Sequence, residues 1–251
     1  MGEVMYHINL KEGDVGEYCI LVGDPGRCEK VASYFDESEF VTSNREFTTY
    51  RGKLDGVDVC VTSTGIGGPS AAIAIEELTK VGVKYFIRVG TCGGINLDVK
   101  SGDLVVATSA IRQEGTSKEY APVEYPASAD MDIVFAIKKA VDKMDVNAHF
   151  GVVQSKDSFY GQHSPEKSPV SYDLLNKWES WKKLGVLSSE METAALYTVA
   201  ASIGVKCGCI LAVIWNQERK AKGLIEEDNL DTGNAIYCAI NAIKVLIEEN
   251  K

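Results

Sequence analysis

Glycine, arginine and threonine follow apolar runs of this sequence in a pattern that suits an anion. The segment Gly23–Arg27 (GDPGR) comes directly after the apolar run Tyr18–Val22. Arg88 lies inside a second apolar run and is followed by Gly90 and Thr91. A glycine turn lets backbone N–H groups approach an oxyanion, and guanidinium groups add planar, charge-assisted donors. We therefore predict an anion site made by Gly23, Arg27, Arg88 and Thr91.

Arg88 needs a partner, because an unpaired charge in an apolar strand is very costly to bury. A structural carboxylate such as Glu46 or Glu77 could supply it. A ligand anion could equally do so, with the Thr91 hydroxyl and the following glycine amides completing the cradle. The sequence favours the ligand and leaves both interpretations open.

Two further segments could hold a sugar and a planar base. Glu190 and Glu192 flank Met191, and a carboxylate there can accept hydrogen bonds from vicinal hydroxyls. The alternative is a first-turn glutamate that complements a helix dipole. Phe159 could stack on a base, and Gln162 could read a carbonyl and an N–H of one edge. The alternative is a core aromatic pair beside a loop.

Strand-like and helix-like segments alternate along the chain without a linker, which predicts one α/β domain over residues 1–251. Asp55-Gly56 predicts a hairpin turn, and Pro69 predicts the first turn of a helix. We expect strands over Tyr18–Val22, Thr48–Leu54, Val57–Thr62, Tyr85–Val89, Leu104–Ile111, Phe150–Ser155 and Lys206–Trp215. We expect helices over Cys28–Phe35, Ser70–Val81, Met131–Met144, Ser168–Leu184, Met191–Ile203 and Asn234–Glu249.

Composition excludes several classes of protein. The 251 residues carry a formal net charge of -10, which argues against a nucleic-acid partner. We expect no membrane span and no signal peptide, because no apolar run has the required length. The seven cysteines form no CxxC pair, so we expect reduced thiols and a cytoplasmic protein rather than zinc or a disulfide framework.

Five motifs occur together and in one order. They are Gly23–Arg27, Asn44–Thr49 (NREFTT), Ser63–Ser70 (STGIGGPS), Arg88–Gly93 (RVGTCG) and Glu190–Glu192 (EME). The set resembles the nucleoside phosphorylase family, which includes uridine phosphorylases and hexameric purine nucleoside phosphorylases. The resemblance runs from about His7 to the last helix. It implies a central mixed β-sheet, partly barrel-like and flanked by helices, and cleavage of a nucleoside by inorganic phosphate without an organic cofactor.

The resemblance also implies roles for individual residues. Phosphate would be bound by Gly23, Arg27, Arg88 and Thr91, and by Arg45 of a neighbouring subunit. The ribose would be bound by Glu192, the Met191 backbone and Glu190, and by His7 across the subunit interface. The base would be bound by Phe159, Gln162, Ile214 and Trp215. A monovalent cation such as K+ would lie between subunits at Glu46, Ile66 and Ser70, and the homo-oligomer would be a hexamer built from dimers.

The resemblance favours a pyrimidine base, and hence uridine. Many purine enzymes of the family carry an aspartate after the late strand, where Trp215 is followed here by Asn216. Two arginines that are usual in uridine phosphorylases are replaced by Ser164 and Gln217, and Lys167 or Arg219 could stand in for them. The alternatives are a purine nucleoside phosphorylase, a nucleosidase that uses water, and a protein that binds a nucleoside without cleaving it.

Overall fold

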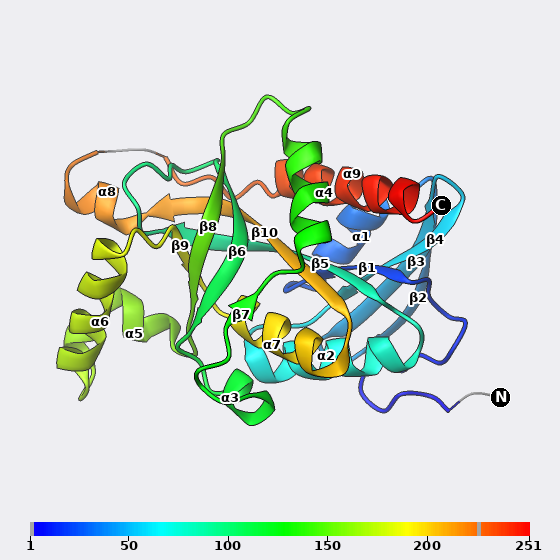
Figure 1. Ribbon diagram of the computed structural model, residues 1–251, viewed down its shortest axis with the longest axis horizontal. Helices are drawn as coiled ribbons and strands as arrows, with labels where there is room; N and C mark the ends of the chain where they lie inside the picture. Colours follow the sequence, from blue (N-terminus) through cyan, green and yellow to red (C-terminus); the bar gives the residue numbers. More distant parts are fainter. Residues whose placement is uncertain (1–2, 225–226) are drawn as a thin grey trace.

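Ten strands form one continuous mixed sheet in the computed structural model, which describes residues 3–224 and 227–251 (Figure 1). The strands are β1 (Tyr18–Val22), β2 (Glu37–Asn44), β3 (Phe47–Leu54), β4 (Val57–Ser63), β5 (Tyr85–Gly94), β6 (Leu104–Arg112), β7 (Ala127–Ser128), β8 (Ala148–Ser155), β9 (Ser188–Glu190) and β10 (Lys206–Asn216). The helices are α1 (Arg27–Ala32), α2 (Gly68–Lys80), α3 (Thr116–Tyr120), α4 (Met131–Val141), α5 (Phe159–His163), η1 (Pro165–Lys167), α6 (Ser171–Lys183), α7 (Thr193–Ile203), α8 (Gln217–Ala221) and α9 (Gly233–Glu249).

The sheet is partly closed into a barrel. Its order is β10-β6-β8-β9-β5-β1-β4-β3-β2, with the short β7 paired to β6, and β10 also pairs with β5. This last pairing closes a ring of five strands, β5, β10, β6, β8 and β9. The expected α/β class and the mixed, partly barrel-like sheet are therefore confirmed.

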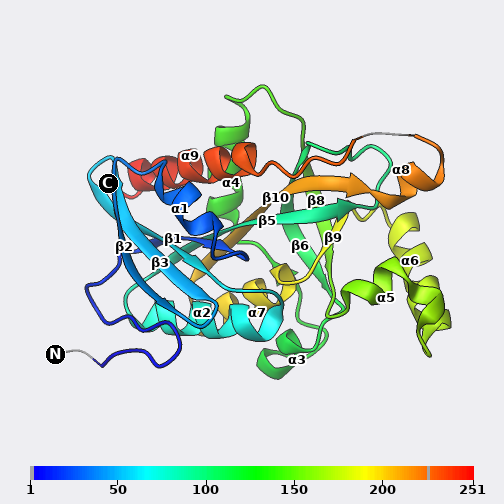
Figure 2. The ribbon, with the colours of Figure 1, turned by 180° about the vertical axis from the view of Figure 1, so that it is seen from behind.

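Helices cover both faces of the sheet. Figure 1 shows α1, α4 and α9 on one side and α2, α3 and α7 on the other, and the reverse view in Figure 2 agrees. Each side has its own apolar core: α1, α4 and α9 contribute to one, and α2 and α7 to the other. Helices α5, α6 and α8 lie together at one end of the molecule (Figure 2). In the described residues, no helix is long and apolar enough to cross a bilayer.

The strand directions gather the predicted turns at one edge of the sheet. β1 is parallel to β4 and to β5, and β5 is parallel to β10. The carboxyl ends of parallel strands share an edge, where ligands bind in open α/β sheets. The turns that begin at Gly23 and Thr64, the Thr91 region of β5 and the end of β10 therefore lie near one another.

Most predicted elements are present, with shifted ends. The expected hairpin is confirmed, and Asp55 and Gly56 both have positive φ, 50° and 79°, which a two-residue turn of this kind requires. The prediction that the strand from Tyr85 ends near Gly90 was wrong. β5 continues to Gly94 because β10 and β9 pair with its second half. The exposed strand β2 and the short β9 were not predicted.

Candidate active site

A cavity of about 770 Å³ opens at the carboxyl ends of these strands. Every residue predicted to form a single-chain anion, sugar or base site contributes to its wall. The lining residues named in that prediction are Gly23, Arg27, Arg88, Thr91, Phe159, Gln162, Glu190, Met191, Glu192, Ile214 and Trp215. The fold thus brings together segments that are about 190 positions apart in the sequence, from Gly23 to Trp215.

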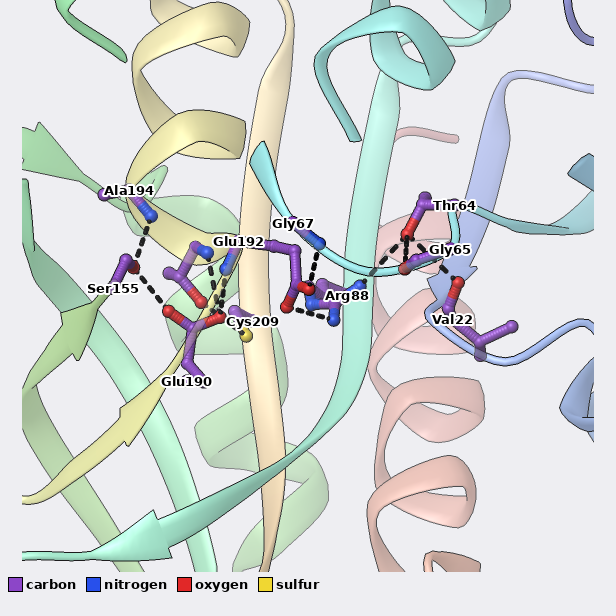
Figure 3. A network of polar contacts seen from close by, with 11 residues as sticks. Val22, Thr64, Gly65, Gly67, Arg88, Ser155, Glu190, Glu192, Ala194 and Cys209 are labelled. Atoms are coloured by element: carbon purple, nitrogen blue, oxygen red, sulfur yellow. Dashed lines mark hydrogen bonds and ion pairs between the residues drawn. The ribbon is translucent and has the colours of Figure 1, made fainter. Parts of the chain in front are cut away.

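Arg88 and Glu192 both line this cavity, and they form an ion pair (Figure 3). Arg88 Nη2 lies 2.5 Å from Glu192 Oε2, and each residue is only 4% exposed. The alternative partners suggested by the sequence, Glu46 and Glu77, are bonded elsewhere, to Ser70 and to His7. Burial lowers the Arg88 pKa most strongly of any single cause, but the charge and hydrogen bond of Glu192, together with the Cys209 and Glu190 groups, outweigh it, and the pKa of Arg88 is raised.

The Arg88 guanidinium still has an unused donor. Its Nε is buried and has no hydrogen-bond partner among the described residues. Arg27 faces the same cavity, where burial lowers its pKa, the Asp24 carboxylate opposes that effect, and the nearby Arg88 charge lowers the pKa further. Two neighbouring cations and a free N–H donor make a site that an anion would stabilise.

Gly23 keeps this part of the cavity open. A Cβ at this position would lie 3.3 Å from the carbonyl oxygen of Gly65 and 3.6 Å from Arg88 Nη2. A larger residue would therefore crowd the turn and the guanidinium together. A glycine here leaves room for a ligand to approach the backbone closely.

The two glutamates of the EME motif have different surroundings (Figure 3). Glu192 Oε1 accepts a hydrogen bond from the Gly67 N–H at 2.7 Å, which ties the glycine turn before α2 to the cavity. Glu190 instead accepts from the backbone N–H groups of Glu192 (2.8 Å) and Thr193 (2.9 Å), and from the Ser155 hydroxyl. Burial, and then the Glu192 charge, raise the pKa of Glu190. Glu190 therefore caps the start of α7 and fixes the backbone that carries Glu192.

Aromatic rings gather at the opposite end of the cavity. The His163 ring lies 4.2 Å from the ring of Phe159 and 5.1 Å from that of Trp215, centroid to centroid. Burial, and then the Lys156 charge, lower the pKa of His163. Gln162 lines the same region. The rings offer flat faces and the amide offers a donor and an acceptor, which together suit a planar heterocycle.

Lys156 is the cation at this end, and the sequence analysis missed it. Its Nζ donates to Ser189 Oγ at 2.6 Å. Burial lowers the pKa of Lys156 to about 8, although the Glu190 and Glu192 charges oppose the shift. Lys167 and Arg219 do not line the cavity, so the suggestion that either supplies the missing charge was wrong. A lysine directly after a predicted buried strand was the signal that could have identified it.

The residues expected to act across a subunit interface lie outside this cavity. His7 Nδ1 is 2.6 Å from Glu77 Oε1. Arg45 lies at the β2–β3 turn with φ 55°, and its guanidinium is 5.8 Å from the centroid of the Tyr6 ring. Within one chain, neither residue contributes to the wall of the cavity. Their assignment to a neighbour's site stays a prediction.

The proposed cation ligands are only partly together. Ser70 Oγ donates to Glu46 Oε1 at 2.6 Å, and this bond lowers the Glu46 pKa. Ile66 is 79% exposed and lies on the rim of the cavity. In the described part of the chain, no group of three or more His, Cys, Asp or Glu side chains could hold a metal ion.

Comparison with known proteins identifies relatives along almost the whole chain. The family profile described as "Phosphorylase superfamily" matches residues 17–246. A uridine phosphorylase of Treponema pallidum is 51% identical, over 98% of this chain and 95% of its own. A uridine phosphorylase of Thermococcus kodakarensis is 42% identical, over 98% and 87%. A guanosine phosphorylase of Halorubrum lacusprofundi is 39% identical, over 96% and 98%.

Proposed function

The chain belongs to the phosphorylase superfamily, and from that membership and the geometry of its cavity we propose that it is a pentosyltransferase that cleaves uridine with inorganic phosphate. The products are uracil and ribose 1-phosphate. One observation carries the proposal: the Nη2 of Arg88 binds Glu192, while its buried Nε–H donor has no hydrogen-bond partner in the part of the chain that the structure describes. An anion site and a sugar-binding carboxylate are thereby joined in one cavity.

Phosphate occupies the end of the cavity formed by Gly23, Arg27, Arg88 and Thr91. The protein has a net charge of -10, so a dianion must be held by local donors against the overall field. The Arg88 charge disfavours the charged form of Arg27, and a phosphate between the two guanidinium groups would offset that repulsion. This gain in favourable charge interactions supports the assignment.

The ribose lies against Glu192 and the Met191 backbone. One carboxylate oxygen of Glu192 accepts from the Gly67 N–H and the other from Arg88, and an ionised carboxylate has about four acceptor positions. Acceptor capacity therefore remains for the 2′- and 3′-hydroxyls. Glu190 acts through Glu192, because its own oxygens bind the α7 backbone and Ser155.

The base lies between the aromatic rings and Gln162, with Ile214 and Trp215 in the wall. Lys156 provides the positive charge that Ser164 and Gln217 cannot. As the glycosidic bond breaks, its electron pair moves onto the ring nitrogen N1 of uracil, and the charge spreads to the two carbonyl oxygens of the base. A cation buried at that end of the cavity stabilises this charge most in the transition state.

The reaction requires positioning more than covalent help from the protein. The C1′–N1 bond stretches and the sugar gains oxocarbenium character. A phosphate oxygen, held by the arginines, then forms the new bond to C1′. The departing uracil anion takes up a proton from solvent. Alignment of the two substrates and fixed charges around them account for the acceleration.

A purine is the alternative base, because one relative is a guanosine phosphorylase. Asn216 stands where many purine enzymes have a proton-donating aspartate. Its side chain is 2% exposed and is fully used: Nδ2 donates to the carbonyls of Asn96 (2.8 Å) and Val99 (2.9 Å), and Oδ1 accepts from the backbone of α8. It cannot also protonate a base, which favours the pyrimidine.

One substrate panel tests the proposal. Purified protein is given uridine, inosine or guanosine, with and without phosphate, and the free base and ribose 1-phosphate are measured by chromatography. We expect uracil and ribose 1-phosphate only when phosphate is present. Faster turnover of inosine would indicate the purine enzyme, and base release without phosphate would indicate a nucleosidase. Tight binding of uridine without products would indicate a binding protein.

We propose further properties from the family resemblance. His7 and Arg45 complete a neighbour's site in a homo-oligomer, a hexamer built from dimers, and K+ binds between subunits at Glu46, Ile66 and Ser70. All seven cysteines are unpaired thiols, which supports a reducing compartment, the cytoplasm. The activity serves the salvage and catabolism of pyrimidine nucleosides.

A further inference from the structure

A chain of hydrogen bonds runs from the ammonium group of Lys156 to the amide of Gln162. Lys156 Nζ donates to Ser189 Oγ at 2.6 Å, and Ser189 Oγ donates to Gln162 Oε1 at 2.9 Å. Gln162 Nε2 then donates to Gln217 Oε1 at 3.1 Å. Ser189 is 3% exposed, so water has little access to replace its bonds. Lys156, Ser189 and Gln162 all line the cavity described above.

The chemistry of the Lys156 ammonium and the Ser189 hydroxyl fixes the direction of these hydrogen bonds. An ammonium group has donors only, so the Ser189 oxygen must accept from it. The single Ser189 proton is then free for Gln162, whose Oε1 accepts it. If the Gln162 amide were reversed, Ser189 would face two donors and its own proton would have no acceptor. Burying a hydroxyl in that state disfavours the reversed amide by about tenfold or more.

Gln217 does not fix the amide in the same way. Its own side-chain amide can turn to offer either an acceptor or a donor to Gln162. The orientation of Gln162 is therefore decided by Lys156 and Ser189. One Nε2–H of Gln162 and one lone pair of its Oε1 remain for a ligand in the cavity.

We propose that Ser189 is a positioning residue that makes the site select uracil over cytosine. The inference rests on the proposed function. Uracil presents a carbonyl next to the N3–H of its ring, which matches the free N–H and the free lone pair of Gln162. Cytosine has an unprotonated N3, so the Oε1 of a fixed Gln162 meets another lone pair. With Gln162 facing the C4 edge of the base, a freely turning amide would offer its N–H to that nitrogen and its oxygen to the C4 amino group, and would lose the discrimination.

The test is a comparison of Ser189→Ala with the wild type. kcat/KM is measured for uridine and for cytidine with saturating phosphate, and the inhibition constant of cytidine against uridine gives the same comparison if cytidine turns over too slowly. We expect the preference for uridine over cytidine to fall about tenfold or more in Ser189→Ala. Ser189→Thr, which keeps the hydroxyl, should retain the preference.

Ser188→Ala is the matched control. Ser188 is also fully buried in β9, but its hydroxyl lies outside the chain from Lys156 to Gln162. An unchanged preference in Ser189→Ala, or an equal change in Ser188→Ala, would overturn the inference. If Ser189→Ala does not fold, Lys156→Met removes the donor that sets the direction and must lower the preference instead. A wild-type protein that cleaves no uridine would refute the proposed function itself, which is a separate outcome.

Discussion

Replacing Arg88 by methionine should damage folding and catalysis in different ways. Methionine keeps much of the side-chain volume and removes the charge. Glu192, which is 4% exposed and 2.5 Å from Arg88, would then be a buried carboxylate without its cation. Breaking a buried ion pair in this way costs about 3–5 kcal/mol of unfolding free energy. We expect Arg88→Met to lose stability on this scale.

The double variant Arg88→Met/Glu192→Gln separates the two effects. A neutral amide removes the uncompensated charge, so the double variant should recover at least about 2 kcal/mol of unfolding free energy relative to Arg88→Met. Catalysis should not recover, because the phosphate donor is still missing. Loss of one preorganised charged donor lowers kcat/KM by about 100-fold or more, equivalent to about 2.7 kcal/mol.

Two assays measure these quantities. Unfolding in urea gives the free energies of unfolding. All variants are measured at one protein concentration, because the stability of an oligomer depends on that concentration. Chromatography of uracil and ribose 1-phosphate gives kcat/KM. Near-normal phosphorolysis by Arg88→Met would remove Arg88 from the site. A double variant as unstable as Arg88→Met would show that the ion pair is not what stabilises this region.

The remaining predictions address the two ends of the cavity and the subunit interface. Lys156→Met should lower kcat for uridine by about 100-fold with a smaller change in KM; an effect on KM alone would contradict a role in the transition state. The pKa of Lys156 is about 8, so its charge is present below that pH and lost above it. The value of kcat/KM should therefore fall as the pH rises through about 8. A profile that stays flat to about pH 9, one unit above the midpoint, would rule this out. Gly23→Ala should raise the KM for phosphate about tenfold and leave the KM for uridine nearly unchanged, in initial-rate kinetics. Co-refolded Arg45→Ala and Arg88→Ala chains should regain about a quarter of wild-type activity, since half the dimers are mixed and one of their two sites is intact; no recovery would place Arg45 outside its neighbour's site.

The sequence by itself determined the kinds of groups that meet in the cavity. Glycine turns after apolar runs predicted where backbone N–H groups would be exposed, and an arginine inside a strand required a partner of opposite charge. Phe159 and Gln162 were identified by their types and spacing. These patterns can be recognised in the sequence because each depends on a few neighbouring residues and on the costs of burying them.

Local patterns did not reveal which of these groups would pair. Glu192 is 104 positions from Arg88, and the sequence offered Glu46 and Glu77 as equal partners. Glu192 becomes the partner of Arg88 because β5 pairs with β9 and β10, and packing along the whole sheet sets the register of these strands.

Tertiary structure also decided the roles of Lys156 and Glu190. The lysine is one residue beyond β8. That position was its one local signal, and it does not tell whether the side chain lies on the surface or is buried beside Ser189. Glu190 resembles a ligand group in the sequence, yet its oxygens cap α7. Burial and hydrogen-bond partners depend on segments distant in the chain, so only the folded protein determines them.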